Sequence, residues 1–119
     1  MAKTPDERES EGRSAPRRRV LLGGKLIYGD PPLSLDCSVA DLSESGARIR
    51  LQGPEPLRKP IYLVVIRQEL AFLAKEEWRK GATIGLSFVR AFDLKNPAPE
   101  LPRIVRQLWI EQTRGRPRE

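Results

Sequence analysis

Two arginines near the N-terminus, Arg13 and Arg17, have the chemistry and spacing needed to capture a compact anion. They form an R-x-x-x-R pair, and an extended five-residue span reaches at most about 17 Å. Two guanidinium groups on such a span can bind opposite sides of one ligand. A guanidinium pairs with two phosphate oxygens at once, matches the O6/N7 edge of guanine and stacks on flat rings. The alternative interpretation of this pair is a solvated basic tail.

A second polar element is the segment D-L-S-E-S-G at residues 41–46, which follows an alternating apolar stretch. The carboxylate of Asp41 can accept hydrogen bonds from guanine N–H groups, and Ser43 can donate or accept beside it. Gly46 lets a ligand approach the backbone closely. The same residue types also suit an ordinary turn, because Asp and Ser bond to local backbone groups and Gly tolerates positive φ. On its own, the segment leaves both interpretations open.

Composition favours binding over catalysis. Twenty-two Lys and Arg against 16 Asp and Glu give a net charge of +6, which attracts anionic partners. The chain has no histidine, which excludes Ser-His-Asp and Cys-His nucleophiles, HExxH zinc sites and Cys/His zinc fingers. The single cysteine, Cys37, lies in an apolar alternating segment and is expected to be a buried small hydrophobe. We therefore expect a non-enzymatic protein with no catalytic residues, metal site or cofactor.

The hydropathy pattern predicts a cytoplasmic protein without a membrane span. The longest apolar run, residues 61–66, is much shorter than the roughly 20 residues that a membrane-spanning helix needs. The N-terminus also has no charged region followed by an apolar one, which a secretory signal would require.

The chain divides into an arm, one domain and a tail. Residues 1–16 are rich in charge, Ser, Gly and Pro, and this composition predicts a flexible arginine-containing arm. Residues 17–113 are expected to form a single domain, because a chain of 119 residues has room for one modest core. Residues 114–119 are charged and contain Gly and Pro, which predicts a disordered tail.

The middle of the chain shows the period of two that is typical of half-buried strands. Three segments place apolar residues at every second position, namely residues 33–39, 47–51 and 84–88. Residues 61–67 and 70–78 are separated only by Gln68 and Glu69, which predicts a tight hairpin. Short strands with turn signals between them predict a closed or nearly closed barrel.

After Arg90 the apolar spacing changes from that of a strand to that of a helix. Residues 101–109 carry apolar side chains at positions i, i+3, i+4, i+7 and i+8, which predicts an amphipathic C-terminal helix. Trp109 is expected on the face that packs against the barrel. The other large aromatics, Trp78 and Phe88, are expected in the core or at the barrel rim rather than at a ligand.

The order of these motifs resembles that of the PilZ family, whose members are bacterial receptors for cyclic di-GMP. The R-x-x-x-R pair is followed by D-x-S-x-x-G, by Trp78 and by the segment I-G-L-S-F at residues 84–88. The resemblance spans about residues 13 to 90. It implies a mainly β fold, a six-stranded antiparallel barrel with a C-terminal helix, in agreement with the strand and helix patterns.

The resemblance also implies which residues bind cyclic di-GMP. Arg13 and Arg17 would hold the phosphates and the guanine faces, while Asp41, Ser43 and Gly46 would recognise a guanine from the barrel surface. Three further arginines match no motif position and are candidate auxiliary cations: Arg18, Arg19 and Arg48.

The leading hypothesis is a receptor whose arm becomes ordered on ligand binding, so that a downstream protein partner senses the change. A second hypothesis, also drawn from the family, is a degenerate adaptor that acts by protein contact without nucleotide. A third is a single-stranded nucleic-acid binder, which the seven aromatics disfavour because most lie at predicted core positions. We therefore expect no specific nucleic-acid partner. Gly12 stands where many family members have a further arginine, so the number of bound ligands stays open.

Overall fold

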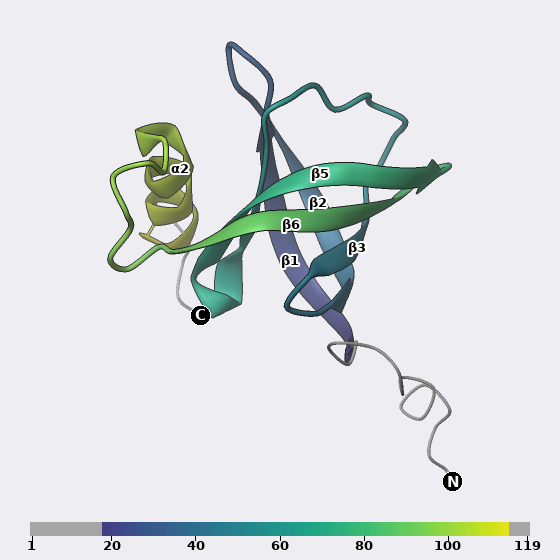
Figure 1. Cartoon of the computed structure of the whole chain (residues 1–119), viewed down its shortest axis with the longest axis horizontal. Helices are drawn as coiled ribbons and strands as arrows, with labels where there is room; N and C mark the ends of the chain where they lie inside the picture. Colours follow the sequence, from purple (N-terminus) through teal and green to yellow (C-terminus); the bar gives the residue numbers. More distant parts are fainter. Residues whose placement is uncertain (1–17, 115–119) are drawn as a thin grey trace, which may run out of the picture.

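The computed structural model describes the backbone of residues 18–114 and the side chains of residues 22–113. The elements in this range are β1 (Arg18–Tyr28), β2 (Leu33–Leu42), β3 (Gly46–Arg50), β4 (Ile61–Val65), the 3₁₀ turn η1 (Ile66–Gln68), β5 (Leu70–Lys80), β6 (Thr83–Asp93) and α2 (Arg103–Arg114) (Figure 1). The predicted arm, residues 1–16, and residues 115–119 of the predicted tail lie outside the described residues.

The six strands form a closed barrel in the order β1-β2-β3-β6-β5-β4, and β4 pairs with β1 to complete the circle. Every neighbouring pair is antiparallel. The predicted mainly β fold with a six-stranded antiparallel barrel and a C-terminal helix is therefore confirmed. Closure pairs all strand edges with one another and removes the need for an edge-protecting element.

Alternation along the strands fills the barrel interior, as the period of two predicted. The inward-facing residues of β2, β3, β6 and the segment after β3 include Cys37, Val39, Ala47, Ile49, Leu51, Ile84 and Leu86, all buried. The alternation also predicted a core position for Leu33, and this prediction is wrong, because Leu33 is 53% exposed. It is the first residue of β2, beside the β1–β2 turn, where the barrel end leaves too few neighbours to cover it.

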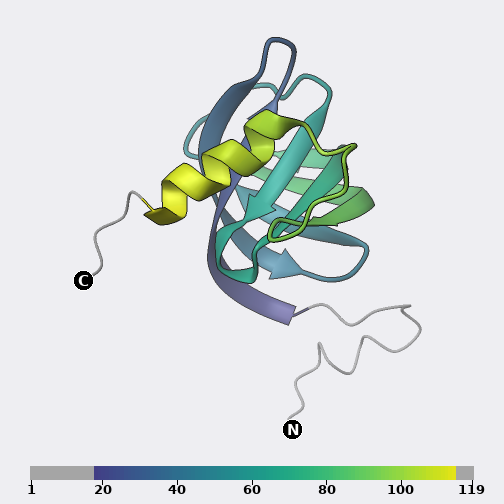
Figure 2. The same cartoon turned by 90° about the vertical axis from the view of Figure 1, so that its left-hand side faces the viewer.

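The helix packs against the outside of the barrel and creates a second apolar cluster (Figure 2). Val105 of α2 is fully buried and belongs to the same cluster as Ile27 of β1 and Val64 of β4. Leu108 and Trp109 are partly buried against this cluster, as predicted. In residues 18–114, no helix is long and apolar enough to cross a membrane.

The hairpin between β4 and β5 is confirmed, but its turn is longer than predicted. Val65 pairs with Leu70, so residues 66–69 make the connection through η1 rather than Gln68 and Glu69 alone. Glu69 adopts a left-handed conformation with φ 61°. A two-residue turn favours Asn-Gly-like pairs that accept positive φ, and this chain has none here.

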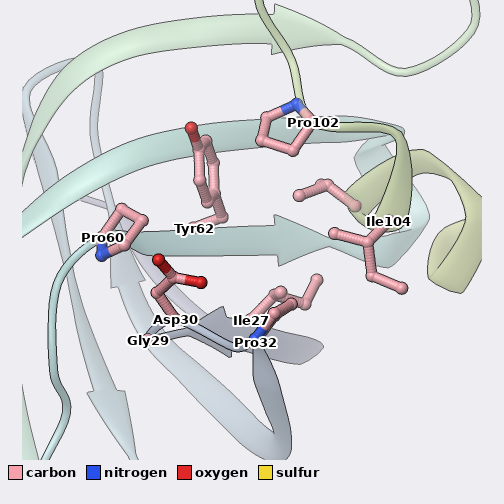
Figure 3. Close-up of a pocket in the computed structure, with 9 residues that line it drawn as sticks. Ile27, Gly29, Asp30, Pro32, Pro60, Tyr62, Pro102 and Ile104 are labelled. Carbon is pink, nitrogen blue, oxygen red and sulfur yellow. The ribbon is translucent and has the colours of Figure 1, made fainter.

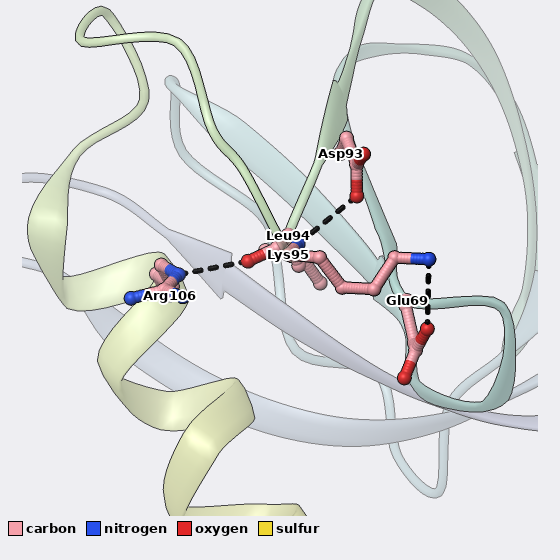
Figure 4. A network of polar contacts seen from close by, with 5 residues as sticks. All are labelled: Glu69, Asp93, Leu94, Lys95 and Arg106. Atoms are coloured by element: carbon pink, nitrogen blue, oxygen red, sulfur yellow. Dashed lines mark hydrogen bonds and ion pairs between the residues drawn. The ribbon is translucent and has the colours of Figure 1, made fainter.

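Polar contacts fix the segment that leads from β6 to α2 (Figure 4). Arg106 Nε of the helix donates to the carbonyl oxygen of Leu94 over 2.7 Å. The amide of Lys95 donates to the carboxylate of Asp93 over 2.9 Å, and its ammonium lies 3.3 Å from the carboxylate of Glu69. These contacts connect the helix, the end of β6 and the β4–β5 turn.

Candidate functional site

One row of paired residues crosses five strands of the barrel. Arg19 pairs with Asp41, and Asp41 pairs with Arg48. Arg48 in turn pairs with Gly85, which pairs with Trp78. Directly paired residues of antiparallel strands project to the same face. Arg48 lies between the buried Ala47 and Ile49, so the side chains of Asp41, Arg48 and Trp78 lie on the outer surface of the barrel. We call these three residues, together with Gly85 and the backbone position of Arg19, the outer row.

A bulge at Ala40 brings Asp41 into the outer row. Val39 pairs with Ile49 and Asp41 pairs with Arg48, so β2 has one residue more than β3 between these two pairs. By plain alternation Asp41 would share the inward face of Val39, which is fully buried. The extra residue shifts the side-chain alternation and turns the carboxylate outward.

Asp41 forms an ion pair with Arg48 across β2 and β3. Nε of Arg48 lies 2.5 Å from Oδ2 of Asp41, and the two side chains are 37% and 8% exposed. The Nε–H of Arg48 makes no hydrogen bond, so the contact with Asp41 depends on the proximity of the two charges. A carboxylate has about four acceptor positions, so this pair leaves Asp41 able to accept from a further donor. Arg48, expected as an auxiliary cation, is thus the partner of the predicted recognition residue.

Ser43 organises the turn between β2 and β3. Its Oγ accepts from the amides of Ser45 and Gly46 over 3.2 and 3.3 Å. Its own amide donates to the carbonyl oxygen of Gly46 over 2.9 Å. The self-capped turn that the sequence allowed is therefore present. It holds the D-x-S-x-x-G segment in one shape immediately beside the outer row.

Gly46 allows two strands to approach each other closely. A Cβ at this position would lie 2.3 Å from the carbonyl oxygen of Leu86 in β6. Among the described glycines, positive φ occurs at Gly29 and Gly81. Gly46 is therefore not required for a left-handed backbone conformation. Its missing side chain lets β3 start directly against β6.

Trp78 was expected in the core or at the barrel rim, and its side chain lies on the barrel surface rather than in the core. Its side chain is 47% exposed. The indole covers its partner Gly85, where a Cβ would lie 2.1 Å from the indole Nε1. Phe88 instead stacks on Phe72 with ring centroids 3.9 Å apart and is confirmed as a core or rim residue. An exposed indole offers a face on which a flat ring can stack.

The remaining predicted residues lie at or beyond the start of β1. Arg18 and Arg19, expected at the junction with the arm, are already part of β1 and pair with Leu42 and Asp41. Arg13 and Arg17 lie outside the described residues. Because Arg18 pairs with Leu42, the chain enters the barrel directly beside the D-x-S-x-x-G turn.

Cys37 is confirmed as a buried residue of the barrel interior. Burial raises the pKa of its thiol to about 12, and the nearby charge of Asp36 adds to this effect. The thiolate is therefore scarce at neutral pH, which makes Cys37 a poor nucleophile. Across residues 18–114, no group of three or more His, Cys, Asp or Glu side chains could hold a metal ion.

Neither a scan against protein-family models nor a search of curated proteins found a match for this chain. The outer row and the turn beside it are thus the features from which a function can be inferred.

Proposed function

We propose that this protein is a cytoplasmic, non-catalytic receptor for cyclic di-GMP, of the PilZ type. The observation that supports this proposal most strongly is the strand register that collects Arg19, Asp41, Arg48 and Trp78 in one outer row. Cyclic di-GMP combines guanine edges, flat rings and phosphates. The row offers a carboxylate acceptor, an aromatic face and arginines, which are the complementary groups.

In this proposal Arg13 and Arg17 bind the phosphates and cover the guanine faces. Arg17 directly precedes Arg18, which pairs with Leu42 beside the turn. An extended span from Arg17 to Arg13 covers at most about 17 Å, which is enough to enclose one compact ligand. Arg18 and Arg19 add positive charge where the arm meets the barrel.

Asp41 recognises guanine by an exchange of partners. Its side chain is 8% exposed under Arg48, so a ligand that uses the carboxylate must shift the Arg48 guanidinium. Guanine offers N–H donors to the carboxylate, and the released guanidinium can pair with a ligand phosphate. Each charged group thus gains a new partner when the ligand binds, which avoids leaving Asp41 buried and unpaired.

Trp78 gives this proposal a spectroscopic test. In a Trp109→Phe background, Trp78 is the remaining tryptophan, and cyclic di-GMP is expected to change its fluorescence as a guanine stacks on the indole. Gly85→Ala would displace the indole and weaken binding about tenfold, because stacking a base on an aromatic contributes about 1–3 kcal/mol. Gly23→Ala, which adds a methyl group with no described atom within 4 Å, is the matched control. Unchanged affinity and fluorescence response in Gly85→Ala would show that the guanine does not stack on Trp78.

The proposed output is the ordering of the arm when the ligand binds. Residues 13–19 carry several arginines and little apolar surface, so a dianionic ligand would supply the contacts that the sequence lacks. Ordering converts occupancy into a new surface that a partner protein can sense. Arg18 and Arg19 already pair within β1, so the predicted mobile segment shortens to residues 13–17. Backbone NMR relaxation of residues 13–17 is expected to show mobility in the free protein and rigidity at saturation. An arm that is equally rigid in both states would rule this output out.

A further inference from the structure

A small apolar pocket lies at the opposite end of the barrel from the D-x-S-x-x-G turn. It has a volume of about 190 Å³ and lies where the β1–β2 turn, the start of β4 and the first turn of α2 meet (Figure 3). β1 begins at Arg18, beside the turn, and ends at Tyr28, directly before the pocket residue Gly29. Eleven residues of strand therefore separate the two regions, a path of about 35 Å along the chain.

The walls of the pocket combine a rigid base with an exposed edge. Ile27 and Val105 are buried at 2% and 0% exposure, so the base belongs to the cluster between helix and barrel. Ile104 is 36% exposed and forms part of the edge. Tyr62 lies between Pro60 and Pro102 in the close-up (Figure 3).

The size of the pocket suits one side chain rather than a whole ligand. Sites for small molecules usually enclose about 300–1,000 Å³, and this pocket is smaller. An apolar cavity of about 150 Å³ is already large enough for a benzene-sized ring. The pocket can therefore accept one aromatic side chain that projects from a protein surface.

The charges around the pocket define the partner further. Arg58, Lys59 and Arg103 are exposed, and none forms an ion pair with another described residue. Lys59 and Arg103 adjoin pocket residues in the chain, and Cβ of Arg58 lies 4.0 Å from the Cβ position of Gly29. A single carboxylate, Asp30, is among the lining residues and can accept from a hydroxyl group.

We propose that this pocket is a docking site for an acidic segment of a partner protein, which inserts one tyrosine side chain. The phenol ring fills the apolar space, its hydroxyl donates to Asp30, and flanking carboxylates meet Arg58, Lys59 and Arg103. Anchoring by one aromatic residue with a charged surround is a common form of protein recognition. The docking site does not depend on nucleotide binding, because it shares no residue with the outer row.

The test uses the full chain and a synthetic peptide, acetyl-Glu-Glu-Tyr-Glu-Glu-amide, in an NMR titration. We expect a dissociation constant on the order of 1 mM, with the largest amide shifts at Gly29, Tyr62 and Ile104. The same peptide with alanine in place of tyrosine, and one with lysine in place of glutamate, are expected to bind at least about fivefold more weakly. Equal binding of the alanine peptide, or shifts centred elsewhere, would overturn the proposal.

Two pairs of variants separate docking from general effects. Ile104→Lys is expected to weaken binding about tenfold, while Val89→Lys, at a site that is 57% exposed in β6, should not. Arg103→Glu is expected to weaken binding about three- to fivefold, whereas Arg67→Glu, in η1 beyond the far end of β4, should have little effect. Equal losses within either pair would contradict the proposal. So would tighter binding of free phenol than of the peptide, or self-association of the chain through the pocket amides.

Discussion

Gly46→Ala is expected to destabilise the barrel by at least about 2 kcal/mol. The added Cβ would lie 2.3 Å from the carbonyl oxygen of Leu86, which belongs to the backbone of β6 and cannot rotate away as a side chain does. Either the β3–β6 pairing or the turn held by Ser43 must shift. At this size of domain, the loss corresponds to a fall in Tm of roughly 8 °C or more.

Thermal and urea unfolding of matched glycine variants measure this effect. Gly23→Ala introduces the same methyl group where no described atom lies within 4 Å, so its free energy of unfolding should stay within about 0.5 kcal/mol of the wild type. If Gly46→Ala and Gly23→Ala are equally stable, the close approach of β3 and β6 does not explain the glycine.

Arg17→Ala is expected to weaken cyclic di-GMP binding about 10- to 150-fold, which corresponds to a charge-assisted contact of about 1.5–3 kcal/mol. The fold is expected to survive, because Arg17 precedes β1. The matched control is Arg8→Ala, which removes the same charge earlier in the same segment. A remote charge offers only screened attraction, so this control should lose no more than about threefold in affinity.

Titration calorimetry at two salt concentrations would separate the two arginines. A specific Arg17 contact predicts that the difference between the variants persists as the salt concentration rises. Equal losses in Arg17→Ala and Arg8→Ala would mean that the segment acts as diffuse positive charge, and the R-x-x-x-R interpretation would then be wrong.

Local patterns were enough to predict the class of fold. The alternation that places Cys37, Val39 and Ile49 inside reflects a physical requirement of any half-buried strand, and the helical spacing around Val105 reflects the same requirement for a helix. What local patterns could not predict was the end of an element. Leu33 continues the alternation but lies where the barrel offers no cover.

The candidate site was predictable only in part, because its geometry depends on register between distant strands. The pairing of Asp41 with Arg48 requires the bulge at Ala40, and no residue in the alternating segment predicts that bulge. The exposed position of Trp78 follows from its pairing with Gly85 across the β5–β6 hairpin. A glycine directly opposite a tryptophan is a usable signal, but only once the register is known.

The most direct test of the proposed function is a calorimetric titration of the full chain with cyclic di-GMP, cyclic di-AMP and GTP. We expect cyclic di-GMP to bind at least about tenfold more tightly than cyclic di-AMP, because adenine lacks guanine's N1–H and 2-amino donors and so offers Asp41 no equivalent replacement for Arg48. GTP should also bind more weakly, since it presents one guanine to the outer row and the arm. Equal affinity for the two cyclic dinucleotides would contradict guanine recognition. Absence of cyclic di-GMP binding would contradict the receptor function itself and favour an adaptor that acts by protein contact alone.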